Sequence, residues 1–315
     1  MSDSHVDPPS SAPPVAPSTP QFAAATQPSY IRTLFLGSDG LRPGWGFAFY
    51  AVTFFALQHF ASDLAWRRTL GAGGLWSMLI EEFGDLAAAT IPALILAHVE
   101  GRPWGAYGLP RAKAFGKLFW VGVLWGFGAI SALMLCLYGL HCFTFGHVVL
   151  HGTRLARFAL FWAVMFLLVG LFEEFLLRGY SQFTLARGIG FWPSAVALSC
   201  AFGLVHLRNG GEHWAGLLAA ACIGFFFCLT LRRTGNLWFA VGFHAAWDWG
   251  ESYFYSVPDS GTIFPGHLLS STPPRGPDWL SGGSVGPEGS LLCFAVIAVV
   301  WIVFDRVYRS AAARS

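Results

Sequence analysis

Three groups of ionisable residues occur within apolar stretches of the chain, at spacings suited to acid–base chemistry. They are Glu173 and Glu174 with Arg178, then His206, and then His244 with Asp248. A charge in the middle of a membrane helix costs about 2.5–3.5 kcal/mol on insertion scales, so such residues usually face the interior of a helix bundle. The three groups are therefore the candidates for a functional site.

The neighbouring carboxylates Glu173 and Glu174 are predicted to have different roles. Glu174 and Arg178 are four residues apart, so they share one face of a helix and can form an ion pair. Glu173 points about 100° away on the same helix. The spacing therefore leaves Glu173 free to face a cavity, where a carboxylate can take a proton from water.

The connection Arg187–Gly190 predicts a helical hairpin that brings His206 level with Glu173. If the chain turns there, both side chains lie about 16 residues, or about 25 Å, from the turn. We therefore expect Glu173 and His206 to share one site. Phe202 precedes His206 by one helical turn and is suited to pack against its ring.

His244 and Asp248 are four apart on a helix expected to begin near Asn236. Asp248 could orient the His244 ring through a hydrogen bond, bind a ligand together with it, or donate to an oxyanion if protonated. The residues alone leave these three roles open. By contrast, we interpret Glu81, Glu82 and Asp85 as a structural polar contact between helices.

The elements that must position these groups are membrane helices. Hydrophobic residues make up 55% of the chain and charged residues 11%, a balance that does not suit a soluble domain of this length. Apolar stretches of about 20 residues, the length that spans a bilayer, recur along the sequence. They are 45–62, 73–99, 117–142, 156–186, 190–207, 213–231, 236–255 and 290–308. The predicted fold is an all-α polytopic bundle with about eight transmembrane helices, or seven if 190–207 is too short.

The ends and loops of the chain complete this organisation. Residues 1–30 are rich in Pro, Ser and Ala and predict a disordered tail, followed by a membrane domain over 31–315 with its catalytic core at 156–255. Most Lys and Arg residues fall in loops on the side of the N-terminus, so both termini are predicted to be cytoplasmic in a multi-pass plasma or inner membrane protein. No basic stretch is dense enough to predict a nucleic-acid partner.

Other protease patterns are absent or badly placed. The HExxH zinc helix does not occur. A GxSxG pattern at Gly282–Gly286 lies in a Gly-rich connection rather than at a strand-to-helix turn. Glu82 stands where the first glycine of a presenilin-type GxGD pattern would be, before Phe83-Gly84-Asp85. These mechanisms are therefore not predicted.

The three groups together resemble the ordered motifs of a known family. Glu173-Glu174-x-x-x-Arg178, Phe202-x-x-x-His206 and His244-x-x-x-Asp248 are similar to those of the CPBP family, which includes type II CAAX prenyl endopeptidases and Abi-type bacteriocin-processing proteases. The likeness covers about residues 156–255. It implies an intramembrane endopeptidase of metallo- or glutamate type with a CAAX-protease-like helical core, acting on a peptide or a membrane-protein segment at the lipid bilayer.

The resemblance also implies roles for the residues. Glu173 would activate water together with His206, and His244 and Asp248 would complete the site. The full predicted site comprises Glu173, Glu174, His206, His244 and Asp248, supported by Arg178 and Phe202. Zinc is a candidate cofactor, held by Glu173, His206, His244 and Asp248 with an open position for water. In the alternative mechanism, which needs no metal, the same residues supply a general base and an oxyanion site.

Two functions of other classes remain as alternatives. A non-catalytic membrane immunity or scaffold protein of the Abi type would keep its protective effect without Glu173. A proton-coupled transporter would use Glu173 and His206 as a proton relay. Transporters of this kind are often built from internal repeats, and no convincing repeat occurs in this chain.

Overall fold

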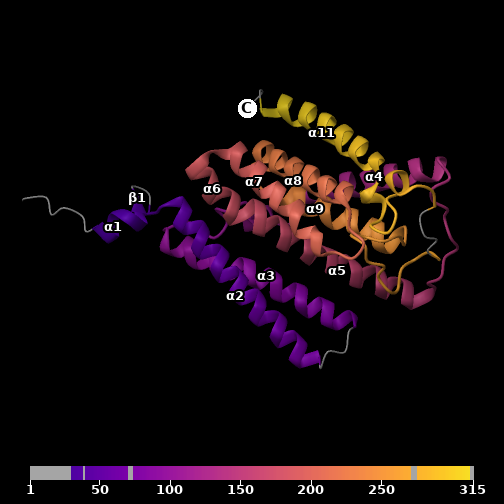
Figure 1. The fold of residues 1–315 in the computed structure, drawn as a ribbon, viewed down its shortest axis with the longest axis horizontal. Coiled ribbons are helices and arrows are strands. Elements are labelled where there is room, and N and C mark those ends of the chain that lie inside the picture. Colours follow the sequence, from indigo (N-terminus) through magenta and orange to yellow (C-terminus); the bar gives the residue numbers. More distant parts are fainter. Residues whose placement is uncertain (1–29, 38–39, 70–73, 271–274, 313–315) are drawn as a thin grey trace, which may run out of the picture.

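The computed structural model describes residues 30–37, 40–69, 74–270 and 275–312, and these residues are almost entirely helical (Figure 1). Among the described residues, one sheet occurs, made of the two-residue strands β1 (Leu36–Gly37) and β2 (Gly40–Leu41). The all-α fold is therefore confirmed. The tail predicted for 1–30 lies outside the described residues, apart from Tyr30 in the first helix.

All eight predicted apolar stretches form helices. The helices are α1 (Tyr30–Phe35), α2 (Pro43–Thr69), α3 (Leu75–Val99), α4 (Lys117–Gly139), α5 (Gly152–Leu176), α6 (Gln182–Ile189), α7 (Phe191–Val205), α8 (Trp214–Thr234), α9 (Trp238–Asp248), α10 (Asp278–Ser281) and α11 (Leu291–Ala312). The short helices α1 and α10 were not among the predicted stretches.

Four helical segments stand out as candidates for crossing a membrane. Within the described part of the chain, these are long and apolar enough by length and composition: Lys117–Gly139, Gly152–Ile189, Trp214–Thr234 and Leu291–Arg309. Helices α7 and α9 are shorter, with 15 and 11 residues, but they continue into the turns His206–Arg208 and Trp249–Phe254. The polytopic helical bundle is therefore confirmed, and the count of about eight transmembrane helices stays a prediction.

The predicted hairpin between Glu173 and His206 is present. Helix α6 ends at Ile189, and Gly190 makes the turn into α7 with a φ of 88°, a conformation that glycine adopts without a steric penalty. Gln182 ties the two arms together, because its side-chain amide donates to the carbonyl of Phe191 and to Ser194. The turn that sets the depth of His206 is thus where the sequence predicts it.

Loops far apart in the sequence gather at one end of the bundle. Arg102 and Arg187 both pair with the side chain of Glu100, which is 1% exposed. Arg233 in α8 pairs with Asp305 in α11. Arg102, Arg187 and Arg233 were predicted to share one side of the membrane, and all three lie at the same end of the helices. That this end faces the cytoplasm stays a prediction.

Helices α4 and α9 pack backbone against backbone. A Cβ atom added at Gly122 or Gly126 of α4 would collide with the carbonyl oxygen of Phe239 or Phe243 in α9, and one added at Gly242 of α9 would collide with α4. Small residues allow such close approach where lipid gives no hydrophobic driving force between helices. The position of α9, which carries His244, is therefore fixed by backbone contacts.

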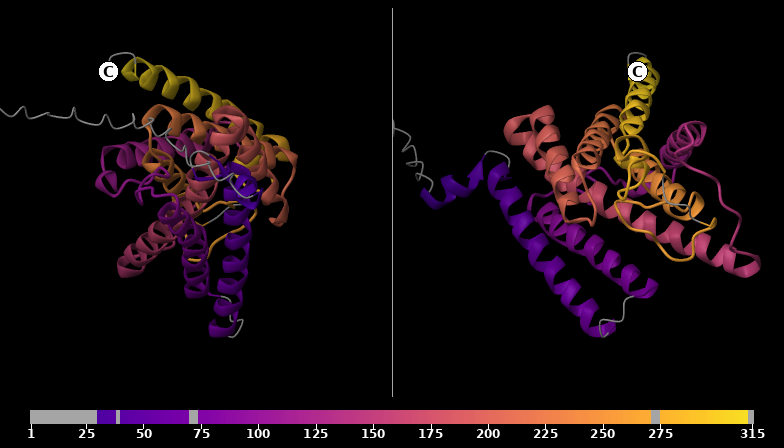
Figure 2. Two further views of the ribbon diagram at one scale, coloured as in Figure 1. Left: turned by 90° about the vertical axis from the view of Figure 1, so that its left-hand side faces the viewer. Right: turned by 45° about the vertical axis from the view of Figure 1, so that its right-hand side comes forward.

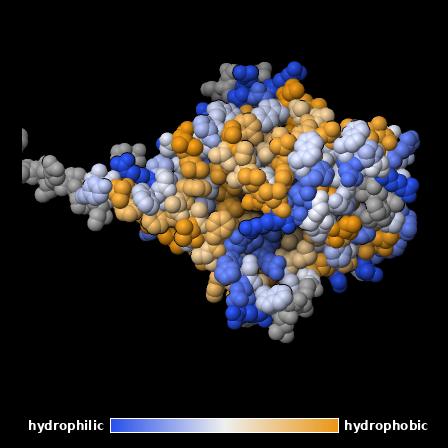
Figure 3. Space-filling view, viewed as in Figure 1, coloured by the Kyte–Doolittle hydropathy of each residue, from blue (hydrophilic) through white to orange (hydrophobic). Residues whose placement is uncertain are grey.

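Helices α2 and α3 form a hairpin (Figure 2), and α3 packs on α5, where Trp76 meets Phe161 edge-on at 6.3 Å. Tyr50 joins the two arms of the hairpin by donating a hydrogen bond to the carbonyl of Ala89. The hairpin meets the bundle near Tyr180, whose ring lies 4.7 Å from that of Tyr50. In the space-filling view, hydrophobic surface covers much of the molecule and surrounds a hydrophilic hollow near its centre (Figure 3).

Candidate active site

Of the predicted site residues, Glu173, His206, His244 and Asp248 line one cavity of about 640 Å³ between α2, α5, α7, α8 and α9, whereas Glu174 lies buried behind it. This volume falls within the range of about 300–1,000 Å³ that is usual for ligand pockets. Most of the wall is apolar. Its ionisable side chains include Glu173, His206, His244, Asp248, Asp259 and Glu288. The cavity therefore unites the three groups that the sequence singled out, and it adds two acidic residues that the sequence did not.

Glu174 forms a buried ion pair with Arg178, as its spacing predicts. Oε1 of Glu174 lies 3.1 Å from Nη1 of Arg178, and neither side chain is exposed. The same oxygen lies 3.0 Å from Nδ1 of His244. A carboxylate can only accept, so Nδ1 of His244 carries the donated proton. This link from α5 to α9 was not predicted.

Arg178 is also held by aromatic rings. Its guanidinium carbon lies 4.6 Å from the ring centre of Phe202 and 5.8 Å from that of Phe227. A desolvated cation over an aromatic face gains about 2 kcal/mol or more. Nε and Nη2 of Arg178 have no hydrogen-bond partner among the described residues, so the rings cover the part of the cation that Glu174 does not reach.

Glu173 is the carboxylate that faces the cavity. Its side chain is 27% exposed, whereas that of Glu174 is fully buried. Oε2 of Glu173 lies 3.6 Å from Nε2 of His244, and Oδ2 of Asp248 lies 3.5 Å from the same nitrogen. The imidazole of His244 therefore stands between three carboxylates, one on Nδ1 and two near Nε2.

His206 lines the cavity from the short 3₁₀ turn His206–Arg208 that follows α7. Its Nδ1 lies 2.7 Å from the carbonyl oxygen of Phe202, which can only accept, so this nitrogen donates. The bond fixes the tautomer and leaves the lone pair of Nε2 available in the neutral ring. The ring of Phe202 meets that of His206 edge-on at 4.8 Å, as the spacing predicts.

Glu173 and His206 share the cavity, but they do not form an ion pair with each other among the described residues. The histidine nitrogen near Glu173 belongs to His244. Equal distance from the hairpin turn predicts that Glu173 and His206 lie at the same height along their helices. It does not predict how each helix is rotated about its axis. The prediction of a common cavity is therefore right, and the pairing within it is different.

Both helices that carry motif carboxylates widen into π-helical turns at those motifs. Helix α5 continues into Leu177–Ser181, where Gly179 has non-helical backbone angles, and α9 continues into Trp249–Phe254. Such turns are rare and occur often at functional sites. In α5 the wider turn contains Arg178, and in α9 it starts directly after Asp248. No sequence pattern indicated either turn.

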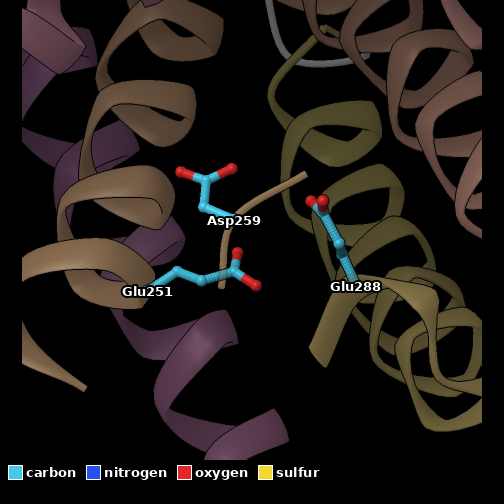
Figure 4. A group of neighbouring side chains, drawn as sticks. All are labelled: Glu251, Asp259 and Glu288. Carbon is cyan, nitrogen blue, oxygen red and sulfur yellow. The ribbon is translucent and has the colours of Figure 1, made fainter. Parts of the chain in front are cut away.

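Three further carboxylates meet beside the cavity. One oxygen each from Glu251, Asp259 and Glu288 lies within 4.8 Å of the others (Figure 4). Burial and mutual repulsion raise the pKa of Asp259 to about 7, and burial raises the pKa of Glu288 to about 7. No periodic pattern in the sequence indicated this group, because Asp259 lies in a loop and Glu288 in the short 3₁₀ turn Pro287–Gly289.

The acidic residues of α3 lie partly towards the bundle. Oε1 of Glu82 is buried without a hydrogen-bond partner among the described residues, whereas Glu81 is exposed. Asp85 is half-buried. The polar contact expected here thus rests on Glu82 and Asp85 rather than on all three residues.

The comparisons with known proteins agree with the geometry. A family model described as Type II CAAX prenyl endopeptidase Rce1-like matches residues 155–250, the segment that contains all seven predicted site and support residues. Searches of the curated proteins and of the solved structures found no match. Residues 155–250 are thus similar to Rce1-like type II CAAX prenyl endopeptidases, in agreement with the CPBP group that the motifs resemble.

Proposed function

We propose that this protein hydrolyses peptide bonds at or within the membrane, with Glu173 as the general base that activates water. The observation that carries the proposal is the different burial of two neighbouring carboxylates. Glu174 is fully buried and bound by Arg178 and His244, whereas Glu173 opens into the cavity. A general base must reach a water molecule, and of the pair Glu173 has that access.

The reaction can be written with the residues of this cavity. Glu173 takes a proton from water, and the resulting hydroxide attacks the carbonyl carbon of the scissile peptide bond. The carbon–nitrogen bond then breaks as Glu173 returns the proton to the leaving amine. His206 assists through Nε2, which accepts a hydrogen bond from the water because Nδ1 is committed to Phe202.

His244 and Asp248 have a supporting role in this scheme. Glu174 holds the His244 ring through Nδ1, and Asp248 stands 3.5 Å from Nε2. When His244 is protonated, Nε2–H is a donor available to the oxygen that gains negative charge during attack. Asp248 stabilises that protonated ring. The arrangement therefore supplies charge stabilisation next to the base.

The distances at His244 suit zinc, the metal that the sequence resemblance leaves open. Nε2 of His244 lies 3.5 and 3.6 Å from carboxylate oxygens of Asp248 and Glu173, close to the roughly 3.3 Å between two ligands of a tetrahedral zinc ion with bonds of about 2.0–2.1 Å. Among the described residues, however, Glu173, His206, His244 and Asp248 offer no three ligand atoms that all lie within 4.8 Å of one another. Zinc bound here would supply Lewis-acid polarisation of the scissile carbonyl, and it would require these side chains to move closer together.

The apolar wall supports a hydrophobic substrate. Phe54 and Phe55 of α2, Phe166 and Phe172 of α5 and Val205 of α7 line the cavity. A peptide that reaches Glu173 must pass along these side chains, and an apolar segment loses less hydration in doing so. We therefore propose a peptide or a membrane-protein segment with apolar residues next to the cleaved bond.

The test is cleavage of a quenched-fluorescent peptide library by the purified protein in lipid nanodiscs. Glu173→Ala and His206→Ala should each lower the rate by at least about 100-fold, the usual scale for losing an acid–base group. Glu81→Gln is the matched control, because Glu81 is an exposed carboxylate on a neighbouring helix. Equal rates for the wild type and both site variants would overturn the proposal. Metal analysis with a chelator series then separates the metallo- from the glutamate-type mechanism.

A further inference from the structure

A second candidate site lies outside the family motifs, where three acidic side chains from separate stretches of chain converge. Glu251 comes from the π-helical turn after α9, Asp259 from the loop that follows, and Glu288 from the turn before α11 (Figure 4). One oxygen of each lies within 4.8 Å of the others. Like charges repel at this distance, and either protonation of the carboxylates or a bound cation relieves that repulsion.

Among the described residues, no Lys or Arg side chain neutralises the three carboxylates directly. Glu251 is the most demanding member, because its side chain is fully buried. Its Oε2 accepts a hydrogen bond from Nε1 of Trp247 at 2.8 Å, whereas its Oε1 has no hydrogen-bond partner. A buried carboxylate oxygen without a partner costs free energy, and a bound ligand removes that cost.

The other two carboxylates each keep an oxygen available. Asp259 accepts a hydrogen bond from Ser252 through Oδ2, which leaves Oδ1. Glu288 accepts from the backbone and the hydroxyl of Ser260 through Oε1, which leaves Oε2. These hydrogen bonds orient both groups. Three directed oxygens can therefore reach one ligand.

We propose that Glu251, Asp259 and Glu288 bind a hard divalent cation of the calcium class. The cluster offers carboxylate oxygens and, among the described residues, no His or Cys ligand, which is a donor set for calcium or magnesium rather than for zinc. The oxygens lie within 4.8 Å of one another, near enough to share one ion. Calcium is the better candidate because its coordination is flexible, at about 2.3–2.6 Å from each oxygen, whereas magnesium demands a near-ideal octahedron at about 2.0–2.1 Å.

A cation here would join the loops to the catalytic helix. Glu251 follows Asp248 by three residues, and Asp259 and Glu288 line the same cavity as Glu173. Cation binding would fasten the segment between α9 and α11 over this side of the cavity. The site is distinct from the zinc donors, since it shares no residue with them.

The experiment is terbium luminescence on the full chain in detergent, after removal of divalent ions with a chelator. Terbium(III) resembles calcium in size and in its preference for oxygen, and it emits when an excited indole lies close. The indole of Trp247 lies close enough for this, because its Nε1 donates a hydrogen bond to Glu251. We expect a saturable signal that calcium displaces, with affinity at least about tenfold weaker in Glu288→Gln, in line with the loss of about 1.4 kcal/mol or more when a ligand charge is removed. Asp278→Asn, an exposed acid in the same segment, should bind as the wild type does.

The outcomes are separable. Absence of a saturable signal in the wild type, or equal affinity in Glu288→Gln and the wild type, would overturn the proposal. Glu251→Gln provides a second variant, and the wild-type titration stays decisive even if that variant fails to fold. The measurement needs no substrate, so its result does not depend on the proposed peptidase activity.

Discussion

Nδ1 of His244 lies 3.0 Å from Oε1 of Glu174, so the buried carboxylate of α5 holds the imidazole of α9. Glu174 is in turn neutralised by Arg178. Glu173, the first residue of the Glu-Glu pair, is exposed to the cavity, whereas Glu174, the second, holds the imidazole of His244 beside it. In the mechanism that we propose, Glu173 therefore does the chemistry and Glu174 positions His244.

Loss of the Arg178 cation should strongly destabilise the fold. Arg178→Ala leaves Glu174 buried without its ionic partner, and breaking a buried pair costs about 3–5 kcal/mol of unfolding free energy. Arg67→Ala is the control, because Arg67 and Asp63 have the same four-residue spacing but side-chain exposures of 73% and 44%; an exposed pair contributes about 0–1 kcal/mol. Chemical unfolding followed by circular dichroism measures both. Similar losses for the two variants would contradict the structural role of the buried pair.

The contact between α4 and α9 should tolerate no added methyl group. Gly126→Ala forces a Cβ into the carbonyl of Phe243, next to His244, and overpacking of this kind costs about 1–3 kcal/mol. We expect a lower Tm together with reduced peptidase activity. Gly128→Ala adds the same methyl group on the same helix where no atom lies within 4 Å, so it should leave both unchanged. A harmless Gly126→Ala would refute the close contact.

Replacement of Asp248 by asparagine tests what this carboxylate does. Asp248 stands 3.5 Å from Nε2 of His244, so we expect it to act through its charge or as a ligand. Asp248→Asn should then lower kcat/KM by about 100-fold or more, a loss of roughly 2.7 kcal/mol. Activity within a few-fold of the wild type would instead assign Asp248 a hydrogen-bond donor role, which an amide retains.

The stability of the cation-free protein should fall as the pH rises. Asp259 and Glu288 have pKa values of about 7 in the folded chain, above the ordinary values of 3.8 and 4.5. Between these two pKa ranges, the folded protein therefore holds protons that the unfolded chain has released. The stabilisation that these protons give is complete below the ordinary pKa values of the two side chains, and it is lost as the pH rises past about 7. Thermal unfolding in chelator between about pH 5 and pH 8 should show a declining Tm. The double variant Asp259→Asn, Glu288→Gln should show a smaller decline. A Tm that is constant or rises over this window in the wild type would contradict the assignment.

Helical spacing was enough to predict the local pairs of the site. Glu174 with Arg178 and Phe202 with His206 are four residues apart, and both contacts occur because a helix of 3.6 residues per turn places such residues on one face. The glycine turn at Gly190 also follows from the sequence. Within a single element, spacing therefore determined the contact.

Contacts between elements required the structure. Nothing in the sequence gives the rotation of α9 that places His244, rather than His206, beside Glu173. The π-helical turns have no periodic signal, since each inserts one residue into an otherwise regular helix. Glu251, Asp259 and Glu288 meet because loops fold back on a helix, and loop paths are set by tertiary packing. The apolar stretches, in contrast, predicted the long helices, because hydrophobicity is a property of each element by itself.

The glycine contact between α4 and α9 has a consequence for how the cavity can change width. Two helices whose backbones already touch have no flexible side chains between them to absorb a displacement, so His244 and Asp248 form a stationary wall. The opposite wall, from α2, meets the bundle mainly through side chains such as Tyr50. If a peptide enters this cavity as we propose, we therefore expect α2 to move and His244 and Asp248 to keep their places against α4.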